Sequence, residues 1–198
     1  MKPLVLPIVL VIWLAAACGG LCAIARYDHR AGLRAPAPHV WPSDSALTFD
    51  PGVLNFVLSL HPQCSCSNAT LSELETILAQ SGDRLNVHAI VVLPENAPES
   101  WRQGDLVARL NTLPHVHVTF DSNGVESQRF GALTSGDAML FSSGRELLFR
   151  GGITESRGHI GENAGRQTIL AVVQGKPVQC GDAPVFGCSL RNHAETQP

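Results

Sequence analysis

Short apolar runs and helix-like repeats alternate along this chain. Residues 54–60 form an apolar run long enough for one buried strand, which stops at His61 and Pro62. Residues 68–80 follow, with apolar side chains at the spacing of one helix face: Leu71, Leu74, Ile77 and Leu78. The pattern predicts a strand that leads directly into a helix.

The alternation continues to residue 174. We expect further strands at 87–93, 116–120, 138–141 and 146–150, and further helices over 106–113 and 163–174. A short helical piece between the strands at 116–120 and 138–141 runs to Phe130 and Gly131. The nearly continuous apolar run at 87–93 is typical of a strand covered on both faces. Residues 142–145, between the last two strands, carry a hairpin signal. This order predicts an α/β domain over residues 49–177, with a central mixed sheet flanked by helices.

An uncharged apolar segment, residues 4–25, lies within the first 26 residues. Its length is close to the roughly 20 residues that cross a hydrocarbon core. Three interpretations fit: one retained transmembrane helix, a cleaved signal peptide, and a lipoprotein signal whose relaxed lipobox ends at Cys18. The apolar run continues well past Cys18, whereas a signal core usually has roughly 7–15 residues, so we favour the anchor.

Residues 27–48 contain several prolines and predict an extended linker between the anchor and the domain. Arg26, Arg30 and Arg34 follow the apolar segment, a bias that favours a cytoplasmic carboxyl domain by the positive-inside rule. Four cysteines beyond the segment instead suit an oxidising compartment. We therefore expect a single-pass protein with its domain on the extracytoplasmic, periplasmic side of a bacterial cell membrane.

The overall composition excludes few classes of function. The chain has 198 residues, 44% of them hydrophobic, which suits one packed domain. Its formal net charge is -3 and it has no basic block, so we expect no nucleic-acid partner.

Cys64 and Cys66 stand one residue apart where the predicted strand meets the predicted helix. Unpaired N–H groups and the positive end of the helix dipole lower the pKa of a thiol placed there. The resulting thiolate serves equally as a nucleophile and as a metal ligand. A disulfide within Cys-Ser-Cys closes a small, strained ring, which suits exchange better than structural cross-linking.

Residues near the two thiols in the sequence could support them. His61, beside Pro62, could stabilise a thiolate or bind a metal, or it could be a strand-end histidine in water. Arg157 and His159 lie in a segment with five glycines between residues 151 and 165, a density that lets backbone approach another group closely. This segment is either part of a functional site or a tight cap for the last helix.

The tail, residues 178–198, contributes Cys180 and Cys188. The simplest pairing is a local disulfide between these two cysteines. In a second alternative, Cys188 is a resolving thiol that attacks a mixed disulfide or a sulfenate at Cys64. Free thiols are the third alternative.

The order β-α-β-α-β-α-β-β-α, with thiols at the first strand-to-helix junction, resembles the thioredoxin fold over roughly residues 49–175. Within that superfamily, the sequence motifs are similar to those of bacterial membrane-anchored thioredoxin-like proteins called RedB. Four stretches carry the resemblance: His61-Pro62-Gln63-Cys64-Ser65-Cys66, Gly151 to His159, Asn163-Ala164-Gly165-Arg166 and Phe186-Gly187-Cys188. The resemblance implies membrane location and redox competence, with Cys64 as the attacking cysteine.

The chain departs from thioredoxins at two places. Thioredoxins have two residues between their cysteines, whereas this chain has Ser65 alone. They also have a cis-proline before the fourth strand that helps to hold a substrate chain, whereas this chain has Thr134-Ser135-Gly136.

The sequence therefore predicts a membrane-tethered, extracytoplasmic thiol-disulfide oxidoreductase that uses the CxC dithiol without a cofactor. Cys64 attacks a disulfide in a protein partner and Cys66 resolves the mixed disulfide. One alternative is a metal-handling protein in which Cys64, Cys66 and either His61 or His159 hold Cu(I), which soft thiolates favour. Another is a thioredoxin-like interaction module without catalysis.

Overall fold

The computed structural model describes residues 5–178 and 181–191. The chain divides into two compact units, one up to Arg30 and one from Ala31 onward. The elements are α1 Val5–Asp28, β1 Leu54–Leu60, α2 Ser65–Ser81, η1 Gly82–Arg84, β2 Leu85–Leu93, η2 Glu99–Trp101, α3 Asp105–Thr112, β3 Val116–Ser122, α4 Val125–Arg129, β4 Asp137–Phe141, β5 Leu147–Gly151, α5 Ala164–Val173 and β6 Gly181–Asp182.

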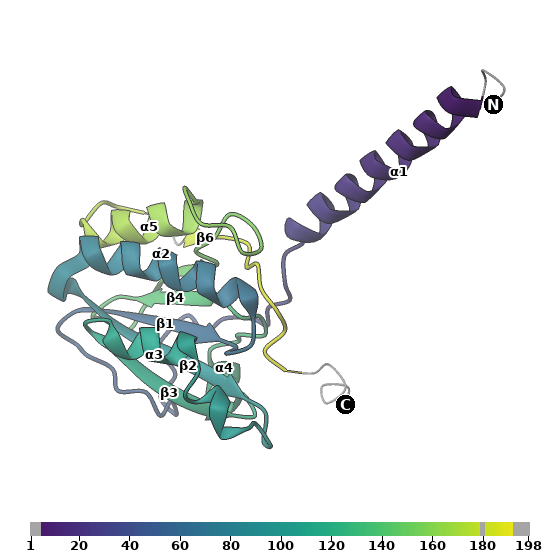
Figure 1. The fold of residues 1–198 in the computed structure, drawn as a ribbon. Coiled ribbons are helices and arrows are strands. Elements are labelled where there is room, and N and C mark those ends of the chain that lie inside the picture. The colour runs from purple at the N-terminus through teal and green to yellow at the C-terminus, as the bar shows by residue number, and fades with distance from the viewer. Residues whose placement is uncertain (1–4, 179–180, 192–198) are drawn as a thin grey trace. The chain divides into compact units, whose positions relative to one another are not determined.

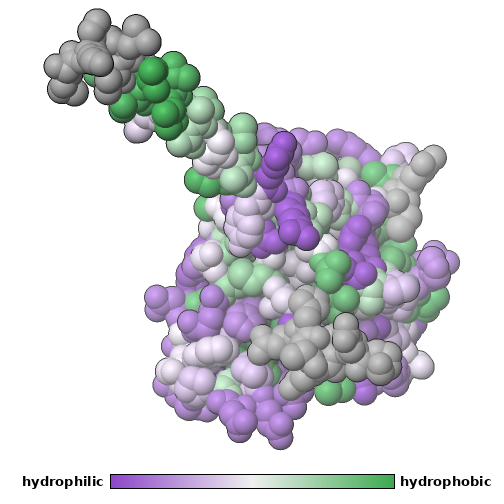
Figure 2. Space-filling view, turned by 90° about the vertical axis from the view of Figure 1, so that its right-hand side faces the viewer, coloured by the Kyte–Doolittle hydropathy of each residue, from purple (hydrophilic) through white to green (hydrophobic). Residues whose placement is uncertain are grey.

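The first unit consists mainly of α1. Residues Leu6–Asp28 are long and apolar enough to cross a membrane, by length and composition. The apolar side chains of this helix are exposed, and Figure 2 shows them as the green surface of the helix. The predicted apolar segment is therefore one helix, which fits either a membrane anchor or a signal.

The second unit is built on a six-stranded sheet in the order β3-β2-β1-β4-β5-β6 (Figure 1). Strands β1, β2 and β3 are parallel, β4 runs antiparallel to β1 and to β5, and β6 is parallel to β5. Strand β1 is central, and its end delivers the chain to α2. The predicted α/β fold with a mixed sheet is confirmed, and it is thioredoxin-like.

Apolar side chains of the strands alternate between two cores on opposite faces of the sheet. Phe56, Leu58 and Leu60 of β1 pack with α2, α3 and α5 in the larger core. Val57 points the other way, into a smaller core that contains Trp41 and Phe130. The second face is therefore covered by loop segments and the short α4 rather than by long helices.

The segment predicted as a linker packs on this domain from Gly32 onward. The Gly32 N–H donates to the Val185 carbonyl at 2.8 Å, and Arg34 forms an ion pair with Asp182 at 2.6 Å. The Trp41 side chain is 4% exposed and lies in the smaller core. Residues 32–48 differ from a free tether because these side chains cover a sheet face that would otherwise meet water.

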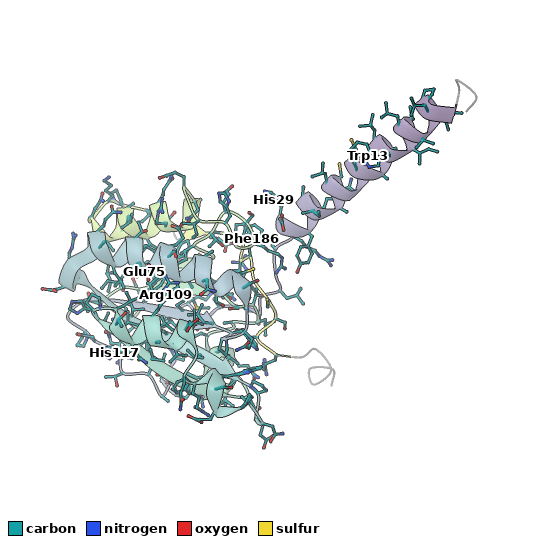
Figure 3. All side chains as sticks on the ribbon, viewed as in Figure 1. Trp13, His29, Glu75, Arg109, His117 and Phe186 are labelled. Atoms are coloured by element: carbon teal, nitrogen blue, oxygen red, sulfur yellow. The ribbon has the colours of Figure 1, made fainter. Side chains whose placement is uncertain are left out.

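A buried carboxylate joins α2 to the segment before α5. Glu73 is completely buried, and it accepts a hydrogen bond from the Gly161 N–H at 2.7 Å and pairs with Arg166 at 2.5 Å. Glu75, on the same helix, instead forms a half-exposed ion pair with Arg109 of α3 (Figure 3). The two glutamates therefore differ in burial although both are paired.

We expect Glu73→Gln to lower the free energy of unfolding by roughly 3–5 kcal/mol, because it leaves Arg166 without its buried counter-charge. The matched variant Glu75→Gln should change it by less than about 1 kcal/mol, since exposed ion pairs contribute little. Urea unfolding of both variants measures the difference. Equal losses of unfolding free energy in the two variants would contradict the stabilising role of the buried pair of Glu73 and Arg166.

Candidate functional site

The turn between β1 and α2 sets the position of the first thiol. The Cys64 N–H donates to the His61 carbonyl at 3.1 Å, and the Ser67 N–H donates to the Cys64 carbonyl at 2.9 Å. Cys64 is thus the N-cap of α2, with extended backbone. The helix begins at Ser65, three residues before the expected residue 68, so Cys66 already lies in its first turn. Both cysteines therefore meet the unpaired N–H groups of a helix start.

The described part of the tail brings a third cysteine to this turn. The Sγ atoms of Cys64 and Cys188 lie 2.6 Å apart. Once Cys64 has lost its proton, the Cys188 thiol is the donor between them, and this hydrogen bond lowers the pKa of Cys64. The Cys188 N–H also points at the Cys64 Sγ, at 3.3 Å. Cys180 lies outside the described residues, so its predicted pairing with Cys188 stays a prediction. The structure does place Cys188 where the alternative of a resolving thiol requires it.

The three thiols have different pKa values. Burial raises the pKa of Cys64, but the hydrogen bond from the Cys188 thiol and the N–H groups of Cys188, Cys66 and Ser67 outweigh it, and the net shift is downward. Burial and the charge of Cys64 raise the pKa of Cys66. Burial and the hydrogen bond to Cys64 raise the pKa of Cys188 to about 12. Cys64 is therefore the first of the three thiols to ionise.

Backbone pairing holds the tail beside the turn. The Ser135 N–H donates to the Cys188 carbonyl at 2.8 Å, and the Leu190 N–H donates to the Leu133 carbonyl at 2.9 Å. Thr134 and Ser189 form an antiparallel bridge between these two bonds. The tail thus forms a short strand-like pair with residues 133–135.

Ser135 connects this pair to the start of α2. Its hydroxyl accepts from the His61 N–H and lies 2.9 Å from the Ser67 hydroxyl. Sequence reasoning noted Ser135 only as the replacement of a proline and did not assign it a role. The sequence signal for this role is the pair of polar residues Thr134 and Ser135, which stand where thioredoxins have a proline.

The predicted supporting residues divide between the site and its surroundings. Pro62 lies in the turn itself. The His61 ring packs edge-on against Trp101, its Nδ1 accepts from the Gln63 N–H, and burial lowers its pKa. Arg157 reaches the tail, where it donates to the Gly187 carbonyl at 2.5 Å. His159 is exposed on its loop.

The glycines between 151 and 165 allow close packing. A Cβ on Gly152 would meet the Pro184 carbonyl oxygen of the tail at 2.6 Å, and one on Gly165 would overlap the Gly152 carbonyl oxygen. The segment therefore contributes Arg157 to the site, while its glycines let the tail and α5 approach closely. Among residues 5–178 and 181–191, no group of three or more His, Cys, Asp or Glu side chains is arranged to hold a metal ion.

A cleft of about 570 Å³ is lined by His61 and Trp101 and by Ser189, Leu190 and Arg191, which directly follow Cys188 in the sequence. None of the described cysteines lines it. The cleft therefore offers space for a second molecule near the turn and the tail that carry the thiols.

No protein-family model matches this chain, and a search of curated proteins finds no significant match. Solved structures do match. An uncharacterised conserved protein from Geobacillus kaustophilus has a TM-score of 0.61 at 19% identity, covering 83% of this chain and 93% of its own. A hypothetical protein from Sinorhizobium meliloti has a TM-score of 0.58 at 19% identity, with coverages of 81% and 93%.

A more distant match is a secreted Mycobacterium tuberculosis disulfide oxidoreductase described as homologous to E. coli DsbE. It has a TM-score of 0.45 at 14% identity, covering 63% of this chain and 82% of its own. At these identities, the two stronger matches establish the fold.

We expect the first cysteine of the intact protein to ionise with a pKa below the ordinary cysteine value of about 8.5. In Cys188→Ala this step should move to higher pH, because Cys64 loses the S–H donor that favours its thiolate. Thiolate ultraviolet absorbance, followed from acid to alkaline pH in detergent, measures the shift. Cys22→Ala, in α1, is the control and should leave the first step in place; an unshifted step in Cys188→Ala would contradict the assigned hydrogen bond.

Proposed function

We propose that the protein is a membrane-tethered, extracytoplasmic thiol-disulfide oxidoreductase centred on Cys64 of the CxC pair. The observation that carries the proposal is the buried Cys64 sulfur, held at the start of α2 with a lowered pKa and a second thiol in contact. A stabilised thiolate next to thiols is the arrangement that thiol-disulfide exchange requires.

The exchange proceeds through a mixed disulfide with a protein partner. A thiolate attacks one sulfur of a disulfide, and the other sulfur leaves as a thiolate. The stabilised charge on Cys64 makes it the nucleophile when the protein gives up electrons and the leaving group when it accepts them. Two thiols lie close enough to be the second one: Cys66, in the first turn of α2, and Cys188, whose sulfur is in contact with that of Cys64.

Location follows from α1 and from the sequence resemblance. The helix is apolar and long enough for one membrane span, and the resemblance to RedB-type proteins implies a bacterial membrane anchor. Four cysteines outside this helix fit the oxidising side of that membrane. We therefore place the domain on the periplasmic side as part of the proposal.

The cleft is the proposed binding space of the partner. Trp101 lines it, together with Ser189, Leu190 and Arg191, which directly follow Cys188. An extended segment of a protein that carries a cysteine pair fits such a space. The proposal therefore names a protein thiol or disulfide as the partner, with no nucleic acid and no cofactor.

We expect the full chain in detergent to show a reversible two-electron couple in glutathione buffers, which disappears in Cys64→Ser. Alkylation of free thiols followed by mass spectrometry measures the fraction oxidised at each buffer ratio. A double variant, Cys18→Ser with Cys22→Ser, receives the same substitution at two cysteines of α1 and should keep the couple.

Two results would contradict the proposal. The wild-type thiols could stay reduced at every glutathione ratio, or the couple could persist in Cys64→Ser. Stoichiometric Cu(I) binding without a redox couple would instead support the metal-handling alternative.

A further inference from the structure

The tail residue Cys188 is more than a neighbour of the CxC pair. We propose that the redox-active disulfide joins Cys64 to Cys188, and that Cys188 is the sulfur that meets the partner. This inference rests on the proposed function, since it names the second thiol and the entry point of the same exchange reaction.

The first support is the close approach of the tail backbone to residue 135. A Cβ on Gly187 would overlap the carbonyl oxygen of Ser135, so the backbone next to Cys188 lies directly on the backbone of residue 135. Arg157 holds the Gly187 carbonyl from the other side. The contact between the Cys64 and Cys188 sulfurs is therefore a consequence of backbone packing.

The second support is that the tail is anchored on both sides of Cys188. Val185 and Phe186 are buried before it, and Leu190, after it, is 3% exposed and belongs to the smaller core. The hydrogen bonds of Ser135 and Leu190 fix the backbone between these anchors. A segment that buries apolar side chains at both ends keeps its cysteine in one place.

The third support is the difference in exposure among the three sulfur-bearing residues. Cys64 and Cys66 are 3% and 8% exposed, whereas Cys188 is exposed. An external thiol can therefore reach Cys188 more easily than either residue of the CxC pair. Exchange rates depend on which sulfur is accessible and on how readily the other sulfur leaves.

The reaction of the oxidised protein with a protein dithiol balances as follows. A partner thiolate attacks the Cys188 sulfur, the bond between the Cys64 and Cys188 sulfurs breaks, and its electron pair leaves on Cys64 as the stabilised thiolate. The second partner thiol loses its proton and attacks the partner sulfur of the mixed disulfide. Cys188 leaves and takes up a proton. The partner loses two electrons and gains a disulfide, and the protein is reduced by two electrons.

The test compares two serine variants of the full chain in detergent. Each protein is oxidised in glutathione buffer, its free thiols are blocked with a maleimide, and it is digested without reduction. Wild type and Cys66→Ser should both give a peptide that links residue 64 to residue 188. Cys188→Ser should lose the intrachain couple. If Cys188→Ser keeps a couple that Cys64→Ser loses, or if wild type links Cys188 to Cys180, the inference is wrong while the proposed function stands. No couple in wild type would overturn both.

A glycine variant tests the packing without removing a thiol. Gly187→Ala should displace the tail and lower the equilibrium constant for the disulfide between Cys64 and Cys188 roughly tenfold or more, because the effective concentration of one thiol at the other falls. Gly104→Ala is the matched control, since a Cβ there meets only ordinary contacts. An unchanged constant in folded Gly187→Ala would contradict the inference. If Gly187→Ala does not fold, the serine variants decide.

Discussion

The contact between the backbone at Gly187 and the backbone at Ser135 determines the chemistry of the site. It has no room for a side chain, and it sets Cys188 against Cys64. Without it, Cys64 would be an N-cap thiol open to water, with only helix N–H groups to favour its charge. With it, Cys64 is 3% exposed, and hydrogen bonds from the Cys188 thiol and the Cys188 N–H both favour its charged form.

Burial and ionisation usually oppose each other at a thiol, because a desolvated thiolate costs free energy. Here the donors outweigh the burial at Cys64, whereas at Cys66 and Cys188 the neighbouring charge adds to the effect of burial. Ionisation of Cys64 thus disfavours ionisation of the two thiols around it. A single negative charge on this group falls on its least exposed member, Cys64.

The strands and long helices could be predicted because their periodicity is strong, as at residues 54–60 and 87–93. The start of α2 was placed too late, because small polar residues at its first turn carry no apolar period. The tail was harder still: its contact with Cys64 joins positions 124 residues apart, and it depends on glycines that admit a backbone. Such a close approach leaves no periodic signal in a sequence. Residues 32–48 fall within the predicted linker because three prolines favour extended chain and the apolar residues among them have no regular period.

The missing proline and the docked tail are two parts of one arrangement. In thioredoxins, the resemblance implies, a cis-proline at this place helps to hold a substrate chain against the thiols. In this chain residues 133–135 give their backbone hydrogen bonds to the protein's own tail, at Cys188 and Leu190. A second chain therefore cannot pair with that edge while the tail is docked. Of the two cysteines in contact, the exposed Cys188, rather than the buried Cys64, is the one that such a chain can reach.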